Sequence, residues 1–344
     1  MKTASKVLLL SGLLLIPFAV RAADTRTEES RDADTGWRIL SVKQGDTSIK
    51  LAPSAGANVF SISYKGTELL KSPKSLKELP GFNFGVPVLY PMPNRVRNGV
   101  FTFDGREYKF TANNNGNFLH GLVHSAAWER DGNEIINGHN SVKNPLKLRF
   151  EPGSDLDKLF PFAHTLRLDV EALDNGVRWT YTVDNSKGDK PVPFGFAIHP
   201  WILYQGPREK TFITIPATHL MESEKLLPTG KLLSLDGSSF DARKPKSLEG
   251  FLSDDVYFGM KSSEPTVIDF RQPRLKITLK ASDDFTHLVL YTPKDQPWFC
   301  VENQTCSTDA HNLFARGLKK ESHLQVVEPG KTASGHVEMR FESY

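Results

Sequence analysis

The sequence predicts an all-β protein, a large antiparallel β-sandwich with few short helices. Apolar runs of about four to seven residues recur along the chain, several of them alternate apolar and polar side chains, and turn-forming residues separate them. Convincing helical windows are scarce, and the best of them is the short stretch 73–79. Because strands and helices do not alternate, a doubly wound fold is disfavoured, and no repeat of fixed period indicates a propeller.

The predicted strands follow one another through the chain. In order they cover residues 38–42, 59–64, 100–103, 108–111, 146–150, 165–170, 177–183, 211–215, 266–270, 275–279 and 287–291. Alternation is clear at 178–183, and pairs such as Asp104-Gly105 and Asp236-Gly237 are typical of turns between strands. No Pro/Ser-rich linker interrupts residues 37–344, so we expect one domain there.

The first 22 residues are typical of a secretory signal peptide. Lys2 and Lys6 precede an apolar stretch from about Val7 to Val20, and small residues precede a cut after Ala22. The stretch is short for a membrane span, which needs about 20 residues, although an uncleaved anchor is the alternative. We therefore expect a periplasmic or secreted protein with no membrane attachment after cleavage, and a flexible polar leader at residues 23–36.

The charge balance gives no sign of a polyanionic partner. The 344 residues hold 43 basic and 40 acidic side chains, a formal net charge of +3. Residues 1–22 carry three of the basic side chains and no acidic one, so the rest of the chain is neutral. A neutral chain lacks the basic surface that nucleic acids require, and we expect no nucleic-acid partner.

The two cysteines, Cys300 and Cys306, are too few for a disulfide framework. An exported protein permits one disulfide, but a bond between them would require a turn at residues 303–305. The core must therefore hold the fold together.

Two residues stand out as candidates for acid–base chemistry. His199 shares a strand face with the small residues Gly195 and Ala197, which would leave room for a ligand. Glu302 follows the apolar run 298–301, where burial would be costly unless the carboxyl is paired or used in catalysis. A hydrogen-bonded structural histidine and a solvent-facing glutamate are the alternatives.

The remaining polar segments are less specific on their own. His120 and His124 have the spacing of two metal ligands on a helix, but the surrounding residues do not form a helical pattern, so we expect no metal. Arg95 follows a Pro-Asn turn, and Asp254-Asp255 is typical of a solvated turn.

Taken in order, these segments resemble the aldose 1-epimerase, or galactose mutarotase, family over about residues 37–344. The matching motifs are Asn94-Arg95 with Gly99-Val100-Phe101, Leu119-His120-Gly121, Gly195 to His199-Pro200, Asp254 to Tyr257, and Glu302 with Asp309-Ala310 and Asn312. The resemblance implies a twisted supersandwich of the galactose mutarotase type, with the sugar in a cleft of one sheet.

The resemblance also implies an isomerase that interconverts the α and β anomers of a free aldose by opening and closing the ring. By similarity, Glu302 is the base, His199 is the acid, and His120 supports the developing charge. Sugar hydroxyls would be bound by Asn94, Arg95 and Asp254. The family needs no metal or organic cofactor, and the expected partner is a small sugar bound to a monomer or weak dimer.

Departures from the family pattern leave the sugar open. Met92-Pro93 stands where the family more often has a Gly-Arg lead-in, and Asp255 stands where many members have His. One alternative is a non-catalytic carbohydrate-binding protein on the same fold. A second is a hexose-6-phosphate epimerase, for which Arg97 is the nearby candidate cation, and a third is a glycoside hydrolase that uses Glu302 and Asp254.

Overall fold

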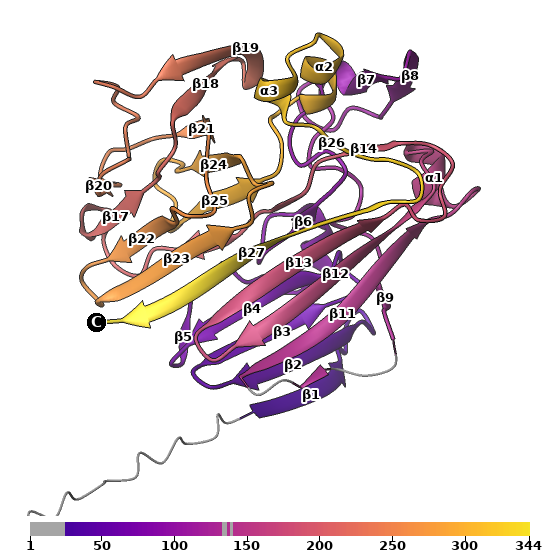
Figure 1. Cartoon of the computed structure of the whole chain (residues 1–344). Helices are drawn as coiled ribbons and strands as arrows, with labels where there is room; N and C mark the ends of the chain where they lie inside the picture. Colours follow the sequence, from indigo (N-terminus) through magenta and orange to yellow (C-terminus); the bar gives the residue numbers. More distant parts are fainter. Residues whose placement is uncertain (1–24, 133–135, 138–139) are drawn as a thin grey trace, which may run out of the picture.

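The computed structural model describes residues 25–132, 136–137 and 140–344, and its strands form antiparallel sheets as the sequence predicts (Figure 1). A five-stranded sheet contains β1 (Thr25–Arg31), β2 (Arg38–Gln44), β3 (Thr47–Ala52), β4 (Asn58–Tyr64) and β5 (Thr67–Glu68). A ten-stranded sheet runs in the order β10 (Ile136–Asn137), β11 (Ser141–Phe150), β12 (His164–Leu173), β13 (Gly176–Asp184), β27 (Thr332–Ser343), β23 (Leu275–Ala281), β22 (Thr266–Phe270), β17 (Thr211–Thr214) and β20 (Lys246–Ser247), with β9 (Glu129–Arg130) beside β11.

An eight-stranded sheet carries the features that matter most below. Its order is β19 (Leu227–Ser234), β18 (His219–Glu224), β21 (Asp254–Phe258), β24 (His287–Tyr291), β25 (Trp298–Gln304), β15 (Ala197–Ile198) and β6 (Val88–Leu89), with β16 (Trp201–Leu203) also paired to β25. Two hairpin-sized sheets pair β14 (Val192–Phe194) with β26 (Gln325–Val327) and β7 (Val100–Phe103) with β8 (Arg106–Lys109). The helices are short: α1 (Asp155–Leu159), α2 (Ala310–Ala315), α3 (Lys319–Ser322), and the 3₁₀ helices η1 (Leu76–Gly81), η2 (Arg97–Gly99) and η3 (Arg208–Lys210).

The large sheets pack through alternating side chains. In β13 the residues Trp179, Tyr181 and Val183 are buried, while the residues between them are half-buried. Tyr181 stacks on Phe196, just before β15, with ring centroids 4.5 Å apart. Aromatic pairs of this kind contribute beyond the apolar area they bury, so β13 and β15 join the ten- and eight-stranded sheets into one sandwich core.

The flexible leader expected at residues 23–36 is wrong for half of its length. Thr25–Arg31 forms β1, which pairs antiparallel with all seven residues of β2. Every side chain of β1 is exposed, so backbone hydrogen bonds and side-chain contacts hold it, such as the 2.7 Å bond from Arg130 Nη2 to Glu29 Oε2. An edge strand of this kind needs no apolar pattern, which is why composition did not reveal it. The expected signal peptide lies outside the described residues.

The helical stretch expected at 73–79 begins slightly later, as η1. Ser75 caps it: its side chain accepts a hydrogen bond from the Lys77 backbone, and the Glu78 carboxylate accepts one from the Ser75 backbone N–H. Pro80 lies inside the last turn, and the chain leaves η1 through Phe82 in the left-handed conformation, with φ of 52°. This exit directs residues 82–84 toward the eight-stranded sheet. None of the helices in the described ranges is long and apolar enough to span a membrane.

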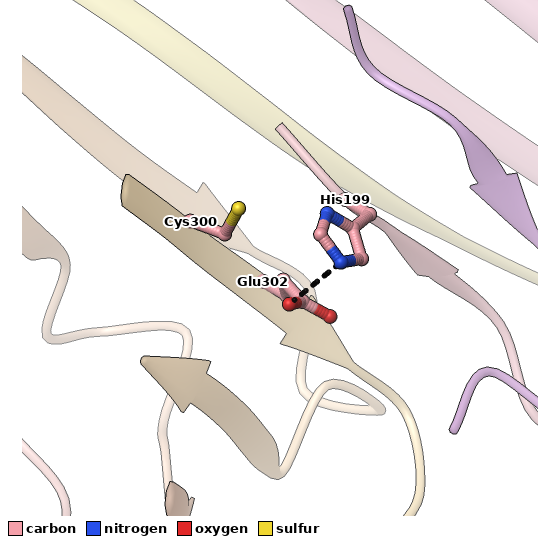
Figure 2. A group of neighbouring side chains, drawn as sticks. All are labelled: His199, Cys300 and Glu302. Carbon is pink, nitrogen blue, oxygen red and sulfur yellow. Dashed lines mark ion pairs between the residues drawn. The ribbon is translucent and has the colours of Figure 1, made fainter. Parts of the chain in front are cut away.

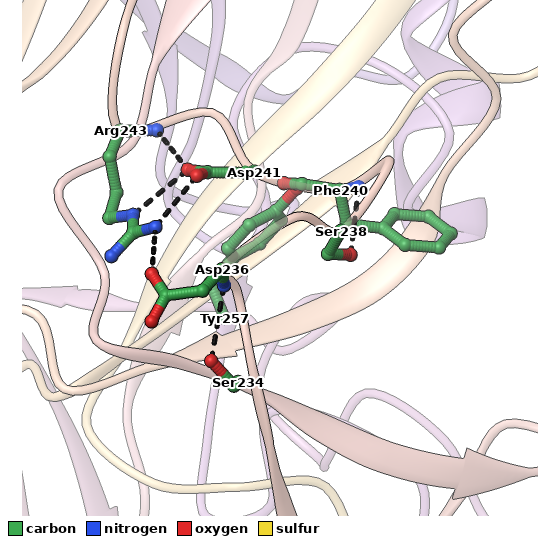
Figure 3. A network of polar contacts seen from close by, with 7 residues as sticks. All are labelled: Ser234, Asp236, Ser238, Phe240, Asp241, Arg243 and Tyr257. Carbon is green, nitrogen blue, oxygen red and sulfur yellow. Dashed lines mark hydrogen bonds and ion pairs between the residues drawn. The ribbon is translucent and has the colours of Figure 1, made fainter.

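The connection from β19 to β20 is held by a polar network (Figure 3). Arg243 forms ion pairs of 2.6 Å and 2.7 Å with Asp236 and Asp241. The Tyr257 hydroxyl donates a 2.9 Å hydrogen bond to the Phe240 carbonyl. Because Tyr257 belongs to β21, this bond ties the network to the strand that begins at Asp254.

Both cysteines are free and buried. Cys300 lies in the extended strand β25, so the turn that a Cys300–Cys306 disulfide requires does not form. Cys306 instead fills space beside Gly195: a β-carbon added there would lie 2.2 Å from Cys306 Sγ and 2.8 Å from Pro93 Cδ. The space at Gly195 therefore accommodates Cys306 and Pro93, and the expectation that it serves a ligand is wrong.

This packing predicts that Gly195→Ala lowers the free energy of unfolding by about 1–3 kcal/mol, because the added methyl overpacks a buried contact. Urea denaturation measures the change. Gly81→Ala is the matched control, since the nearest atom to its added β-carbon is 3.5 Å away. The loss of unfolding free energy caused by Gly195→Ala should be smaller in a Cys306→Ala background, because the sulfur that the added methyl meets is absent. Equal midpoints for Gly195→Ala and the wild type would contradict the packing.

Candidate active site

The register of β25 places His199 and Glu302 opposite each other. Ala197 of β15 pairs with Gln304, and Trp201 of β16 pairs with Cys300. The same antiparallel register sets His199, between the two short strands, across from Glu302. Pro200 cannot donate to the ladder, which interrupts pairing at this point and leaves the two side chains to interact.

The two side chains form a buried pair (Figure 2). His199 Nε2 lies 3.1 Å from Glu302 Oε1, and the two residues are only 4% and 3% exposed. Every residue of β25 is buried, so water cannot solvate the carboxylate freely. Gln304 Nε2 donates a 3.1 Å hydrogen bond to the other carboxylate oxygen. A buried carboxyl with a close nitrogen partner suits acid–base chemistry better than simple packing.

Burial moves the proton affinities of the pair in opposite directions. Burial, and then the nearby charge of Asp254, raise the pKa of Glu302 to about 8. Burial lowers the pKa of His199 to about 4. Because the two groups lie 3.1 Å apart, we treat them as one unit that holds a single proton between these limits.

Within the part of the chain that the structure describes, one buried ring nitrogen of each cavity histidine lacks a hydrogen-bond partner, which affects how readily the ring holds a proton. Nδ1 of His199 and Nδ1 of His120 have no hydrogen-bond partner among the described residues. An imidazolium at His199 would carry a proton on Nδ1 with no acceptor, so the charged ring is a strong acid. Burial, followed by the proximity of His199, lowers the pKa of His120 well below its usual value, so that ring stays neutral.

A cavity of about 200 Å³ opens beside the pair. Its volume lies below the range of about 300–1,000 Å³ common for drug-sized ligands, which suits a small polar molecule. All six residues that the sequence singles out as catalytic or substrate-binding line it: Asn94, Arg95, His120, His199, Asp254 and Glu302. The other lining residues are Phe82, Asn83, Leu119, Trp201, Val289 and Tyr291.

Charged and polar groups converge on the side of the cavity formed by the loop after β6 and the start of β21. Asn94 Oδ1 accepts a 2.8 Å hydrogen bond from the Arg95 backbone, and Arg95 Nε donates one of 3.2 Å to Asn114 Oδ1. Asp254 is half-buried, and this burial raises the pKa of its carboxyl while the charge of Arg95 opposes the rise. Asp255, its neighbour, accepts a 2.7 Å bond from Ser253 Oγ and does not line the cavity. A guanidinium and a carboxylate are well suited to binding neighbouring hydroxyls.

The Leu-His-Gly segment has an unusual backbone. His120 and Gly121 both have φ of 69°. A β-carbon at Gly121 would lie 2.3 Å from the Tyr90 carbonyl oxygen, so glycine is required for this close approach. The resulting turn brings the His120 ring within 5.1 Å of the His199 ring, centroid to centroid. His124 is directed elsewhere and does not line the cavity.

The pair also belongs to a group of possible metal ligands. Donor atoms of His199, Cys300 and Glu302 lie within 4.8 Å of one another. Figure 2 shows the three side chains as neighbours. Cys300, however, packs against Trp201 and Trp298, and burial raises the pKa of its thiol well above the usual range. Cys300 does not line the cavity, whereas His199 and Glu302 both line it and lie 3.1 Å apart, so the donors fit an acid–base pair better than a metal centre.

Two other features are less suited to function. A larger hollow of about 510 Å³ lies beside β11 and β12. Its residues Lys147 and Arg167 form ion pairs with Asp131, which neutralise much of its positive charge. Arg97, the candidate for binding a phosphate, pairs with buried Asp309 at 3.5 Å and does not line the cavity beside Glu302.

Sequence reasoning missed the aromatic walls of the cavity. Phe82 packs edge-on against His120, with centroids 4.6 Å apart, and Trp201 stacks on His199 at 5.1 Å. Tyr291 ends β24, next to β25. Trp201 follows the His-Pro pair in the sequence and could have been found there, whereas Phe82 and Tyr291 carry no local signal that links them to the site.

Comparisons with known proteins identify the family and the fold of the chain. The aldose 1-epimerase family model matches residues 38–340. The galactose mutarotase of Sus scrofa is 28% identical over 169 residues, which cover 45% of this chain and 44% of that protein. The match therefore spans less than half the length of this curated relative. Uncharacterized protein YihR of Escherichia coli K12 is 29% identical over 308 residues, covering 86% of this chain and 90% of that protein.

Solved structures share the fold. A galactose mutarotase-like protein from Clostridium acetobutylicum superposes with a TM-score of 0.83 at 18% identity, covering 93% of this chain and 99% of that one. Galactose 1-epimerase from Lactobacillus acidophilus superposes with a TM-score of 0.74 at 16% identity, covering 94% and 100%. With the family model matched over most of its length, the chain belongs to the aldose 1-epimerase family.

Proposed function

We propose that the protein is an aldose 1-epimerase that interconverts the α and β anomers of a free aldose. The observation that carries the proposal is the buried His199–Glu302 pair, 3.1 Å apart at the wall of a cavity of sugar-binding character. Opening a hemiacetal ring requires a base for the anomeric hydroxyl and an acid for the ring oxygen. The pair can supply both, His199 from the segment between β15 and β16 and Glu302 from β25.

In the proposed reaction, the sugar enters with its anomeric hydroxyl toward Glu302 and its ring oxygen toward His199. The Glu302 carboxylate takes the hydroxyl proton while the His199 imidazolium protonates the ring oxygen, and the C1–O5 bond breaks to give the open-chain aldehyde. After rotation about the C1–C2 bond, protonated Glu302 returns its proton to the carbonyl oxygen and His199 takes one from the O5 hydroxyl as the ring closes on the other face. The pair holds one proton before and after each step.

The other cavity residues bind and orient the sugar in this proposal. Neutral His120 hydrogen-bonds an oxygen near C1, where charge develops. Arg95, Asn94 and Asp254 bind the hydroxyls at the far side. Arg95 is the single Lys or Arg among the described cavity residues, which favours an unphosphorylated sugar. The position opposite Glu302, which a glycoside hydrolase would give to a second carboxyl, is taken by His199.

Glu302→Gln should lower kcat by about 10²–10⁴-fold while KM changes far less, because the amide cannot accept the proton. Polarimetry on freshly dissolved α-glucose and α-galactose measures the rate. Glu249→Gln, at an exposed position, is the control and should match the wild type. If the wild-type protein did not raise the mutarotation rate of any common aldose above the spontaneous rate, the proposed activity would be refuted. If calorimetry then detected sugar binding, a non-catalytic binding protein would be favoured.

The pKa values predict a plateau of kcat/KM between about pH 4 and about pH 8. Below the lower limit both groups are protonated and no base remains; above the upper limit the shared proton is lost and no acid remains. Initial rates corrected for spontaneous mutarotation give the profile. A flat profile through pH 9, or an optimum confined to strongly acidic pH, would contradict the shared proton.

Asp254→Asn should move the alkaline limb of this profile to lower pH. The charge of Asp254 raises the pKa of Glu302, so its removal makes Glu302 a stronger acid. Because Asp254 also lines the cavity, KM should rise in the same variant. Asp255→Asn is the matched control. An alkaline limb that stays in place in Asp254→Asn would show that the two carboxyls are not coupled.

We also propose that the protein is exported and acts in the periplasm or outside the cell. The proposal rests on the signal-peptide pattern of residues 1–22. Mass spectrometry of the protein purified from the periplasm should find an N-terminus at Ala23. A chain that keeps Met1 in the cytoplasm would contradict it.

A further inference from the structure

Beside Trp201, whose ring stacks on His199, the ammonium of Lys71 lies among three aromatic rings. Its Nζ is 4.5 Å from the centroid of Phe84, 4.6 Å from that of Trp201 and 4.7 Å from that of Trp298. Lys71 follows β5, and its backbone N–H donates a 2.8 Å hydrogen bond to the Trp201 carbonyl. Within the described part of the chain Lys71 forms no ion pair, and its ammonium lies over three aromatic rings in cation–π geometry.

Trp201 connects this cluster to the cavity. Its ring stacks on His199 with an interplanar angle of 18° and packs edge-on against Trp298 with centroids 4.4 Å apart. Its Nε1–H donates a 2.9 Å hydrogen bond to the Phe82 carbonyl. Phe82 in turn packs edge-on against His120. One indole therefore contacts His199 directly and reaches His120 through a single intervening residue.

We propose that Trp201, held in place by the Lys71 ammonium, is a positioning residue that orients both cavity histidines. His199 needs such support, because its Nδ1 has no partner among the described residues and the polar contact of its Nε2 is the one with Glu302 Oε1 at 3.1 Å. In the proposed reaction, this contact must open when a sugar enters between the two groups. While it is open, the stacked indole of Trp201 holds the His199 imidazole in the same plane.

The histidine rotamer matters because proton transfer demands close alignment. A misplacement of about 1 Å in a reacting group can cost about 100-fold in rate. The aromatic stack acts on orientation, and the sugar hydroxyls bind on the far side at Arg95 and Asp254. Loss of the stack should therefore reduce kcat more than it raises KM.

The test compares Lys71→Met, which keeps an unbranched side chain of nearly the same length and removes the charge, with Lys71→Arg, which keeps a cation over the rings. Lys246→Met is the matched control, since Lys246 Nζ lies 4.9 Å from the Phe251 ring and does not line the cavity. Trp201→Phe is a further variant that keeps a ring beside His199 and removes the N–H bond to Phe82. Each variant is assayed for mutarotation and for the imidazole ¹H–¹⁵N NMR signals of His199 and His120.

Lys71→Met should lower kcat by about five- to twenty-fold with KM changed less than about two-fold, and should shift or broaden both imidazole signals. Lys71→Arg should restore wild-type behaviour, and Lys246→Met should leave both readouts unchanged. Trp201→Phe should disturb the His120 signal through the loss of the Phe82 bond. Wild-type kcat and signals in Lys71→Met would overturn the proposal, as would a Lys71→Arg variant as impaired as Lys71→Met.

The catalytic readout rests on the proposed epimerase function, but the NMR readout does not. If the wild type has no mutarotase activity, the proposed function fails while the imidazole signals still report whether Lys71 and Trp201 orient the histidines. If the wild type is active but the imidazole signals are the same in Lys71→Met as in the wild type, the positioning role is refuted and the proposed function is not.

Discussion

The candidate site depends on one buried contact, in which His199 Nε2 lies 3.1 Å from Glu302 Oε1. A carboxyl on a fully buried strand is costly unless it is paired or protonated, and an unpaired imidazolium is costly for the same reason. Sharing one proton satisfies both groups. The contact follows from the register of β25 with β15 and β16, and Pro200 interrupts the ladder where the two side chains meet. The strand pairing that builds the sheet thus also brings together the proposed acid and the proposed base.

The rest of the site modifies this contact. Asp254 adds a charge that favours protonation of Glu302, and Arg95 opposes it. The left-handed backbone at His120 and Gly121 brings a second, neutral histidine beside the first. Gly195 allows Cys306 to pack closely just before β15, so the segment that carries His199 is fixed by core packing. The chemistry and the stability of the eight-stranded sheet are therefore linked through the same few residues.

Much of this arrangement is predictable from the sequence, and the failures have physical causes. Alternation and turn residues predict most central strands, since burial on one face imposes the pattern. β1 was missed because an edge strand held by its backbone needs no apolar side chains. The six polar residues of the cavity carry recognisable motifs, and the fold brings them together. Phe82 and Tyr291 were missed because their roles arise only when η1 and β24 pack near β25, which no local pattern encodes. The missing side chain of Gly195 suggests space for a ligand, but Cys306 fills that space, and it is more than 100 residues away in sequence.

The central claim, that His199 and Glu302 share one proton across neutral pH, is tested most directly by following the side-chain carboxyl carbon of Glu302 and the ring nitrogens of His199 by NMR as the pH is varied. The account predicts one transition near pH 4, another near pH 8, and no change between them. A Glu302 carboxyl that titrates near its ordinary value of about 4.3, together with a His199 that titrates near about 6.5, would contradict it.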